Sequence, residues 1–282
     1  MRYCSVNNIK LCYQDVGSGE TMVFLHGLGS NSTDWQQQID YFSQKYRVVA
    51  IDCRGHGRSD KPDGKYTIPL FADDIVQLFT HLEIDYFHLV GFSMGGMMAF
   101  QIAVDNPQKI KTLTIINSSP AVLYNTFAMK VTVWSRLILI KLMGLDKLSK
   151  VIGKKIFPSD SQENLRKQFS ASMQMLSKSS YIRSLLSFLG WDVSDKLSLL
   201  QMPVLVIAAE HDYTSVELKK DYCKKIVKSK LVVISDSYHA TPMDQPDILN
   251  NHIASFIESC FFAEDLMLDT LALKVSEIST SH

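Results

Sequence analysis

The stretch 91–95, Gly-Phe-Ser-Met-Gly, places a serine between two glycines. This G-x-S-x-G pattern is typical of a sharp turn from a strand into a helix, because the small residues let the backbone reverse closely. Such a turn exposes the hydroxyl of Ser93 at the carboxyl edge of a sheet, near the positive end of the following helix, where a developing negative charge is stabilised. The pattern predicts a nucleophile for acyl transfer. An ordinary glycine-rich turn is the alternative that the pattern alone leaves open.

A serine nucleophile needs a base to take its proton and an acid to orient that base. His239 is the predicted base, because it stands between the last expected strand and the closing helix, the final position in the order serine, acid, histidine. Asp212 is the predicted acid, because it directly follows an apolar strand expected at 203–209. Glu210 and Asp236 are its rivals.

The tetrahedral intermediate of acyl transfer also requires two backbone donors for its oxyanion. Met94, directly after the serine, is expected to supply one of them. Leu28 is expected to supply the other, from the glycine-containing loop 26–29 that follows the first apolar strand. For His26, in the same loop, shaping the loop is favoured over a catalytic role. The loop 52–60 is also predicted to be a rigid turn, with bonds from Asp52 and Arg54.

Short apolar strands alternate with helical segments around these residues, which indicates an α/β fold with a mostly parallel sheet. An antiparallel hairpin is expected to open the chain, with turn-forming residues at 15–20. The other expected strands are 22–25, 47–52, 87–91, 112–117, 203–209 and 231–235, and the expected helices are 34–46, 67–82, 94–106, 216–227 and 248–262.

Strand signals stop between residues 120 and 191, where several helices broken near Gly144, Gly153 and Pro158 are expected. We interpret this segment as a helical cap inserted into a core made of 1–119 and 192–262, and we leave the order of the tail 263–282 open. Aromatic and methionine residues of the cap are candidates for an apolar acyl pocket, although ordinary helix packing explains each of them as well. They are Trp134, Phe157, Phe169, Met173, Met175, Tyr181, Phe188 and Trp191.

Composition narrows the class of protein. Hydrophobic residues make up 46% and charged residues 21% of 282 residues, as in a globular enzyme, and the formal net charge of zero predicts no nucleic-acid partner. Five scattered cysteines form no metal or redox pair, so neither a metal nor a cofactor is expected. The N-terminus lacks the apolar run of a signal peptide, and no segment is long and apolar enough for a transmembrane helix. We therefore expect a cytoplasmic protein.

In the order 26–29, 52–60, 91–96, 202–212 and His239, the chain resembles the α/β-hydrolase fold superfamily. The serine within Gly-Phe-Ser-Met-Gly-Gly is similar to that of carboxylesterases, enol-lactonases and cofactor-free haloperoxidases. The resemblance implies a serine esterase that uses an acyl-enzyme and no cofactor. A carbon–carbon bond hydrolase, a haloperoxidase or perhydrolase, and a non-catalytic binding module are the alternatives. Many carbon–carbon hydrolases carry tryptophan after the histidine, whereas Ala240 stands here.

Charge is distributed unevenly along the chain. Residues 121–191 carry eleven lysines and arginines against three acidic residues, a net charge of +8, so the rest of the chain carries −8. Solvation of the outer helix faces explains this excess without any function. The alternative is attraction of an anionic ester substrate, including an acyl group on an acidic carrier, or of a negatively charged membrane surface.

Overall fold

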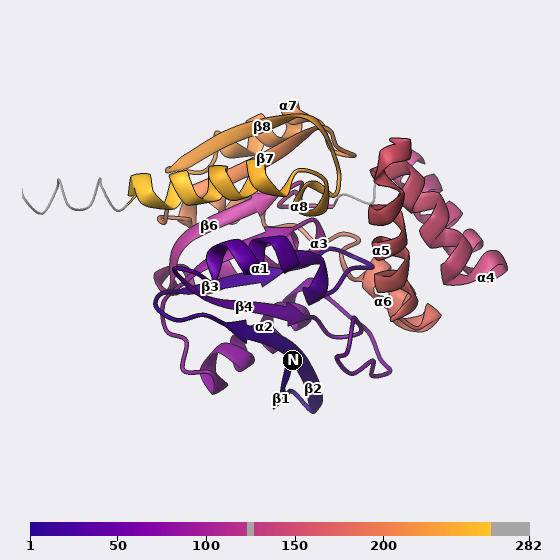
Figure 1. Ribbon diagram of the computed structural model, residues 1–282, viewed down its shortest axis with the longest axis horizontal. Coiled ribbons are helices and arrows are strands. Elements are labelled where there is room, and N and C mark those ends of the chain that lie inside the picture. The colour runs from indigo at the N-terminus through magenta and orange to yellow at the C-terminus, as the bar shows by residue number, and fades with distance from the viewer. Residues whose placement is uncertain (123–126, 261–282) are drawn as a thin grey trace, which may run out of the picture.

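The computed structural model describes residues 1–122 and 127–260, and it contains one eight-stranded sheet flanked by helices (Figure 1). The strand order is β1-β2-β4-β3-β5-β6-β7-β8; β2 pairs antiparallel with both of its neighbours, and the pairs from β4 to β8 are parallel. The strands are β1 (Arg2–Val6), β2 (Ile9–Val16), β3 (Thr21–Leu25), β4 (Arg47–Asp52), β5 (Phe87–Phe92), β6 (Ile110–Ile116), β7 (Val204–His211) and β8 (Ser229–Tyr238).

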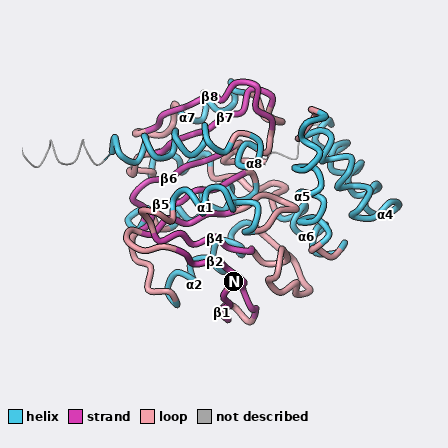
Figure 2. The backbone as a smooth tube through the Cα atoms, viewed as in Figure 1, coloured by secondary structure: helices cyan, strands magenta, loops and turns pink. Residues whose placement is uncertain are grey.

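Helices cover both faces of the sheet, as the tube in Figure 2 shows. On one face, Trp35, Ile39 and Phe42 pack with the closing helix 246–260, while α2 and α3 pack on the other face. The labelled helices are α1 (Gln36–Phe42), α2 (Ile68–His81), α3 (Met94–Asp105), α4 (Phe127–Ile156), α5 (Glu163–Gln174), α6 (Lys178–Ser187), α7 (Val216–Cys223) and α8 (Thr241–Asp244), and the closing helix follows α8. Short 3-10 turns lie at Ser32–Trp35, Pro107–Lys109, Asp160–Gln162 and Ser194–Leu199. The predicted α/β fold class is confirmed.

The apolar strands are buried on both sides because helices cover both faces. Every residue of β3 is buried, and β4 and β5 are buried over nearly their whole length. Because these three strands are parallel, their carboxyl ends lie at one edge of the sheet. The loops that carry polar side chains begin at that edge.

Two local predictions were wrong. The hairpin turn is formed by Asn7 and Asn8, whose φ angles of 45° and 59° suit a two-residue turn. Of the residues 15–20, the first two belong to β2 and 17–20 join β2 to β3. Gly153 does not break a helix, because α4 continues to Ile156 and Gly153 faces Arg166 and Phe169 of α5. A kink occurs at Gly144, where φ is 76°.

Helices α4, α5 and α6 form one helical insertion between β6 and β7, at the right of Figure 1. Its own apolar cluster includes Phe157, Phe169 and Met173 and also contacts Ala240 and Met243 of the core. The insertion therefore packs against the loop that follows β8. The tail 263–282 lies outside the described residues. Among the helices that the structure describes, none combines the length and the apolar character needed to cross a membrane.

Candidate active site

Ser93 lies at the sharp turn between β5 and α3 that the sequence predicted. Its backbone has φ 53° and ψ −117°, a strained conformation that is rare for a residue with a side chain. The turn is tight enough that a methyl group on Gly91 would collide with the carbonyl of Gly95, and one on Gly95 with the carbonyl of Leu25. The two glycines of the pattern are therefore required by close backbone contacts, and the strain presents the hydroxyl at the end of β5.

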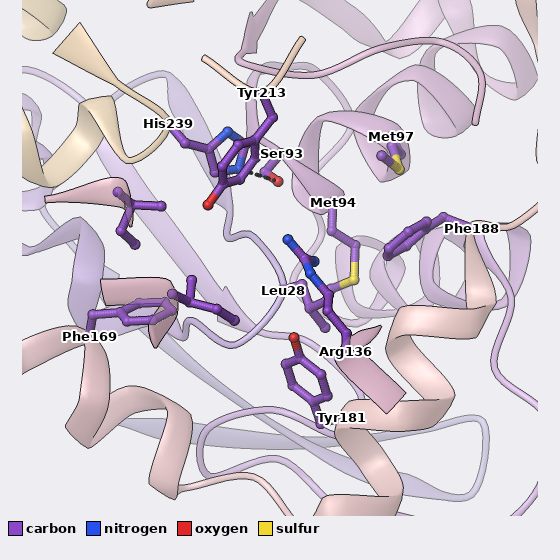
Figure 3. Close-up of a pocket in the computed structure, with 12 residues that line it drawn as sticks. Leu28, Ser93, Met94, Met97, Arg136, Phe169, Tyr181, Phe188, Tyr213 and His239 are labelled. Carbon is purple, nitrogen blue, oxygen red and sulfur yellow. Dashed lines mark hydrogen bonds between the residues drawn. The ribbon is translucent and has the colours of Figure 1, made fainter. Parts of the chain in front are cut away.

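The structure brings Ser93, His239 and Asp212 into one hydrogen-bonded chain (Figure 3 shows its first bond). Ser93 Oγ lies 2.9 Å from His239 Nε2, and His239 Nδ1 lies 2.5 Å from Asp212 Oδ1. Because an ionised carboxylate only accepts, His239 donates through Nδ1 and leaves Nε2 free to accept the serine proton. Tyr213 stacks on the imidazole at 4.3 Å between ring centroids and fixes its plane.

Asn117, directly after β6, links the loop of His239 to β7, the strand that leads to Asp212. Its amide donates to the His239 carbonyl at 2.7 Å and to the Thr241 hydroxyl at 2.8 Å. Its Oδ1 accepts from the backbone of Ala209, in β7, at 2.7 Å. We did not identify this residue from the sequence, where its only signal was its position at a strand end.

The Asp212 carboxylate is fully buried and accepts four hydrogen bonds. Oδ1 accepts from His239 and from the Tyr213 backbone, while Oδ2 accepts from the Thr214 hydroxyl and the Lys219 ammonium. Burial by itself raises the pKa of this carboxyl, but His239 and Lys219 outweigh it, so the pKa of Asp212 lies well below its ordinary value. The acid is therefore ionised at neutral pH.

The rival acids lie elsewhere. Glu210 accepts a hydrogen bond from the Asp236 backbone, and both side chains are exposed. Together with His211 they place possible metal-ligating atoms within 4.8 Å of one another. All three side chains face solvent, and none lines the cavity at Ser93. This trio offers no enclosed site for an ion.

Leu28 and Met94, the two expected oxyanion donors, both line the cavity next to Ser93. Met94 is the first residue of α3, so its N–H has no partner within the helix. His26 Nδ1 donates to the Gly27 carbonyl at 2.8 Å, and its Nε2 accepts from the Cys53 backbone at 3.0 Å. His26 thus shapes the loop that carries Leu28.

In the neighbouring loop 52–60, only one of the two expected side chains bonds the loop itself. The Asp52 carboxylate accepts from the backbone N–H of Arg58, within the loop, at 2.8 Å and from that of Ser32, outside it, at 2.7 Å. Arg54 instead leaves the loop and pairs with Asp74 of α2 through two bonds of 2.6 Å.

A cavity of about 100 Å³ lies in front of Ser93, between the sheet edge and the helical insertion. From the insertion, Arg136 and Tyr181 direct their polar ends into the same space (Figure 3). Tyr181 is 1% exposed, and its hydroxyl has no hydrogen-bond partner among the described residues. Arg136 acts electrostatically on that hydroxyl, so a cation and a hydroxyl together face the nucleophile across the cavity. We had not singled out Arg136 from the sequence.

Four of the eight candidate pocket residues of the insertion lie in different places. Phe188 lines the cavity. Trp134 is 60% exposed, because it lies on the outer side of α4, and Phe157 is completely buried within the insertion's own cluster. Trp191 packs in the core and donates to Gln101 at 2.8 Å. Helix packing accounts for the last two.

The other four members of the candidate set also divide. Phe169 and Tyr181 line the cavity. The sulfur of Met173 lies where a side chain on Gly29 would be, so the insertion packs directly on the loop of Leu28. Met175 contacts the Asn31 amide at 3.7 Å.

Comparison with known proteins identifies the family of a chain that has this strained turn, this hydrogen-bonded chain and this strand order. The chain belongs to the α/β hydrolase fold family, whose model matches residues 20–246. It is 29% identical to 3-oxoadipate enol-lactonase 2 of Acinetobacter baylyi over 90% of this chain and 95% of the relative. The protein is thus a member of a family of hydrolases.

Solved structures agree on the fold. The enol-lactonase of Burkholderia xenovorans superposes with a TM-score of 0.83 at 22% identity, covering 91% of this chain and all of the other. An esterase of Exiguobacterium antarcticum gives a TM-score of 0.84 at 24% identity, covering 90% and 97% of the two chains. At these identities the likeness concerns the fold alone.

Proposed function

We propose that the protein hydrolyses carboxylic esters, including cyclic enol esters, through an acyl-enzyme on Ser93. One observation carries the proposal: Ser93 Oγ, His239 and the buried Asp212 form an unbroken hydrogen-bonded chain at the wall of a cavity. The sequence similarity to an enol-lactonase over nearly the whole chain supports it.

In the first half-reaction, Ser93 Oγ attacks the ester carbonyl while His239 Nε2 takes the hydroxyl proton. The backbone N–H groups of Leu28 and Met94 stabilise the oxyanion that forms. The tetrahedral intermediate then collapses, its bond to the alkoxy oxygen breaks, and His239 returns the proton to that leaving oxygen. Water, activated by the same imidazole, attacks the acyl-enzyme and releases the acid.

The residues opposite the nucleophile suggest the substrate class. Arg136 supplies a positive charge and Tyr181 a neighbouring hydroxyl, which together match the oxygens of a carboxylate. We therefore propose that the ester carries a second, ionised carboxyl group, as a half-ester or a lactone of a dicarboxylic acid does. The enol-lactone of 3-oxoadipate, named for the relative, is a compound of this class.

We further propose that the helical insertion acts as a cap that closes over this substrate. The insertion supplies Arg136, Phe169, Tyr181 and Phe188 to the cavity, while the core supplies the reacting groups. Closure over the sheet edge excludes water from the ester until the acyl-enzyme forms. Selection of the substrate and the chemical step thus reside on different segments of the chain.

The test is Ser93→Ala with a panel of short esters and a fluorophosphonate probe. We expect hydrolysis to fall by a factor of about 10⁴ or more, since the hydroxyl is the nucleophile, and the label to be lost from the peptide that contains residue 93. Ser118→Ala, which removes the neighbouring hydroxyl that bonds the Ser93 carbonyl, is the control and should keep the label at Ser93. Near wild-type turnover in Ser93→Ala would refute the proposal.

A further inference from the structure

Lys219 is a lysine with no exposed side-chain surface, and it contacts the acid of the hydrogen-bonded chain. Its ammonium donates to Asp212 Oδ2 at 2.6 Å, to the Thr214 carbonyl at 2.8 Å and to the Thr214 hydroxyl at 2.7 Å. The three N–H bonds of the ammonium are therefore all used. The Thr214 hydroxyl donates in turn to Asp212 Oδ2 at 2.7 Å, so lysine, threonine and aspartate form a closed ring of bonds.

The start of α7 places this charge. Ser215 caps the helix by accepting from Leu218 at 3.2 Å, and Lys219 follows within the first turn on the face that buries Tyr222 and Cys223. Removing a charge from water is unfavourable unless it is paired and fully hydrogen-bonded. A methionine or leucine would fill the same space without that cost, so packing alone does not explain a lysine here.

We propose that Lys219 is a positioning residue of the active site: it holds Asp212 in place and keeps His239 in its neutral, proton-accepting form between turnovers. The inference rests on the proposed function of the Ser93, His239 and Asp212 chain. Lys219 does not touch the substrate cavity, and it acts only through the carboxylate.

The charge balance gives the reason. Without Lys219, the buried carboxylate would keep its bonds from Thr214 and the Tyr213 backbone but would lose the cation beside it. A proton on His239 would then complete a neutral buried pair, and the resting base would be occupied. With Lys219, the carboxylate is already neutralised, so a proton on His239 leaves the buried group with a net positive charge. That state becomes favourable when the oxyanion forms beside it during acyl transfer, which is when His239 must hold the proton.

The other charged and titratable groups around these residues do not replace Lys219. Tyr213 stacks on the imidazole, and its partial burial raises the pKa of its hydroxyl, so it carries no charge at neutral pH. Burial also raises the pKa of Tyr222. Arg136 lines the cavity on the far side of the nucleophile, and Lys155 lies over the ring of Tyr213 at 4.8 Å. The remaining groups near the strand ends are Tyr181, Glu210, His211, Asp236 and Asp244.

The experiment compares pH profiles of kcat/KM for a neutral short-chain ester. Lys219→Met removes the charge at similar volume, and Lys219→Gln keeps a hydrogen-bond donor without the charge. In both variants we expect the acidic limb of the profile to move up by about one pH unit or more, so that activity lost at neutral pH partly returns at pH 9. Lys220→Met removes the same charge from the exposed face of the same helix and should leave the limb unmoved.

A purely structural lysine would lower activity at every pH and leave the limb in place, and that result would overturn the proposal. A shift of the limb in Lys220→Met of the same size would overturn it too, as would failure of both Lys219 variants to fold. Ser93→Ala is measured in parallel. If it keeps turnover, the proposed function fails; if it loses turnover while the Lys219 limb stays unmoved, only the role of Lys219 fails.

Discussion

Replacement of Arg136 by methionine tests the proposed substrate class. Arg136 lies on α4, half-buried, and it faces Ser93 across a small cavity together with Tyr181. Methionine keeps an unbranched apolar stem while it removes the guanidinium. The paired substrates are a half-ester of a short dicarboxylic acid and its neutral analogue of equal length, which differ in the charge at the end remote from the ester.

The magnitude follows from Coulomb's law. Two unit charges about 4 Å apart at an effective dielectric constant of about 20 attract by about 4 kcal/mol. The partial exposure of Arg136 and the hydration that both ions lose reduce this to about 2 kcal/mol. Since about 1.4 kcal/mol corresponds to a factor of ten, Arg136→Met should lower kcat/KM for the half-ester about 30-fold.

The loss should appear mainly in KM, because the carboxylate is bound equally in the ground state and in the transition state. The neutral analogue should change by less than about threefold. Lys141→Met, which removes an exposed cation of the same helix, is the matched control and should affect neither substrate. Equal losses for the half-ester and the neutral ester would show that Arg136 serves packing, and the carboxylate hypothesis would be refuted.

Other predictions concern stability, chain length and salt. Burial lowers the pKa of His56 to about 3, so below about 6.5 the unfolded chain takes up a proton that the folded state does not; stability is therefore lost as pH falls, by about 2 kcal/mol between pH 7 and 5. His56→Asn should flatten that slope in urea unfolding, and parallel slopes would contradict this account. Phe188 lines both the cavity at Ser93 and a neighbouring one of about 550 Å³, so Phe188→Ala should raise the ratio of octanoyl to acetyl ester turnover; an unchanged ratio would count against it. The excess positive charge of the insertion should make kcat/KM for an anionic or carrier-bound substrate fall between about 20 and 300 mM salt, and Lys154→Glu with Lys155→Glu should weaken that fall. The same salt response for a neutral ester would exclude steering.

Much of the fold was predictable because the central parallel strands β3, β4 and β5 are short apolar runs that helices bury on both faces. The prediction for 47–52 agrees with β4 at both ends. The positions of Ser93, Asp212 and His239 were also predictable, since each directly follows a strand and the carboxyl ends of parallel strands meet at one edge. Local sequence was sufficient to predict a site residue wherever the end of one strand determined its position.

Arg136 and Lys219 could not be predicted in this way, because their roles depend on contacts between segments far apart in the sequence. Arg136 reaches the cavity only because α4 packs over the sheet edge, and Trp134, two residues earlier, points outward for the same reason. Lys219 stands beside the exposed Lys220 in a charged helix. Its helical spacing with Tyr222 and Cys223 was the available signal for a buried lysine.

The two ends of the helical insertion leave the sheet side by side. Ala121 pairs with Asp192, and Val122 exchanges backbone hydrogen bonds with Trp191 at 2.9 Å and Gly190 at 3.0 Å. A segment whose ends meet can be replaced by another of different length without separating the strands that hold Ser93 and Asp212. The insertion is thus a natural unit of exchange for protein engineering, because a graft at residues 122 and 190 replaces the segment while its two ends stay paired.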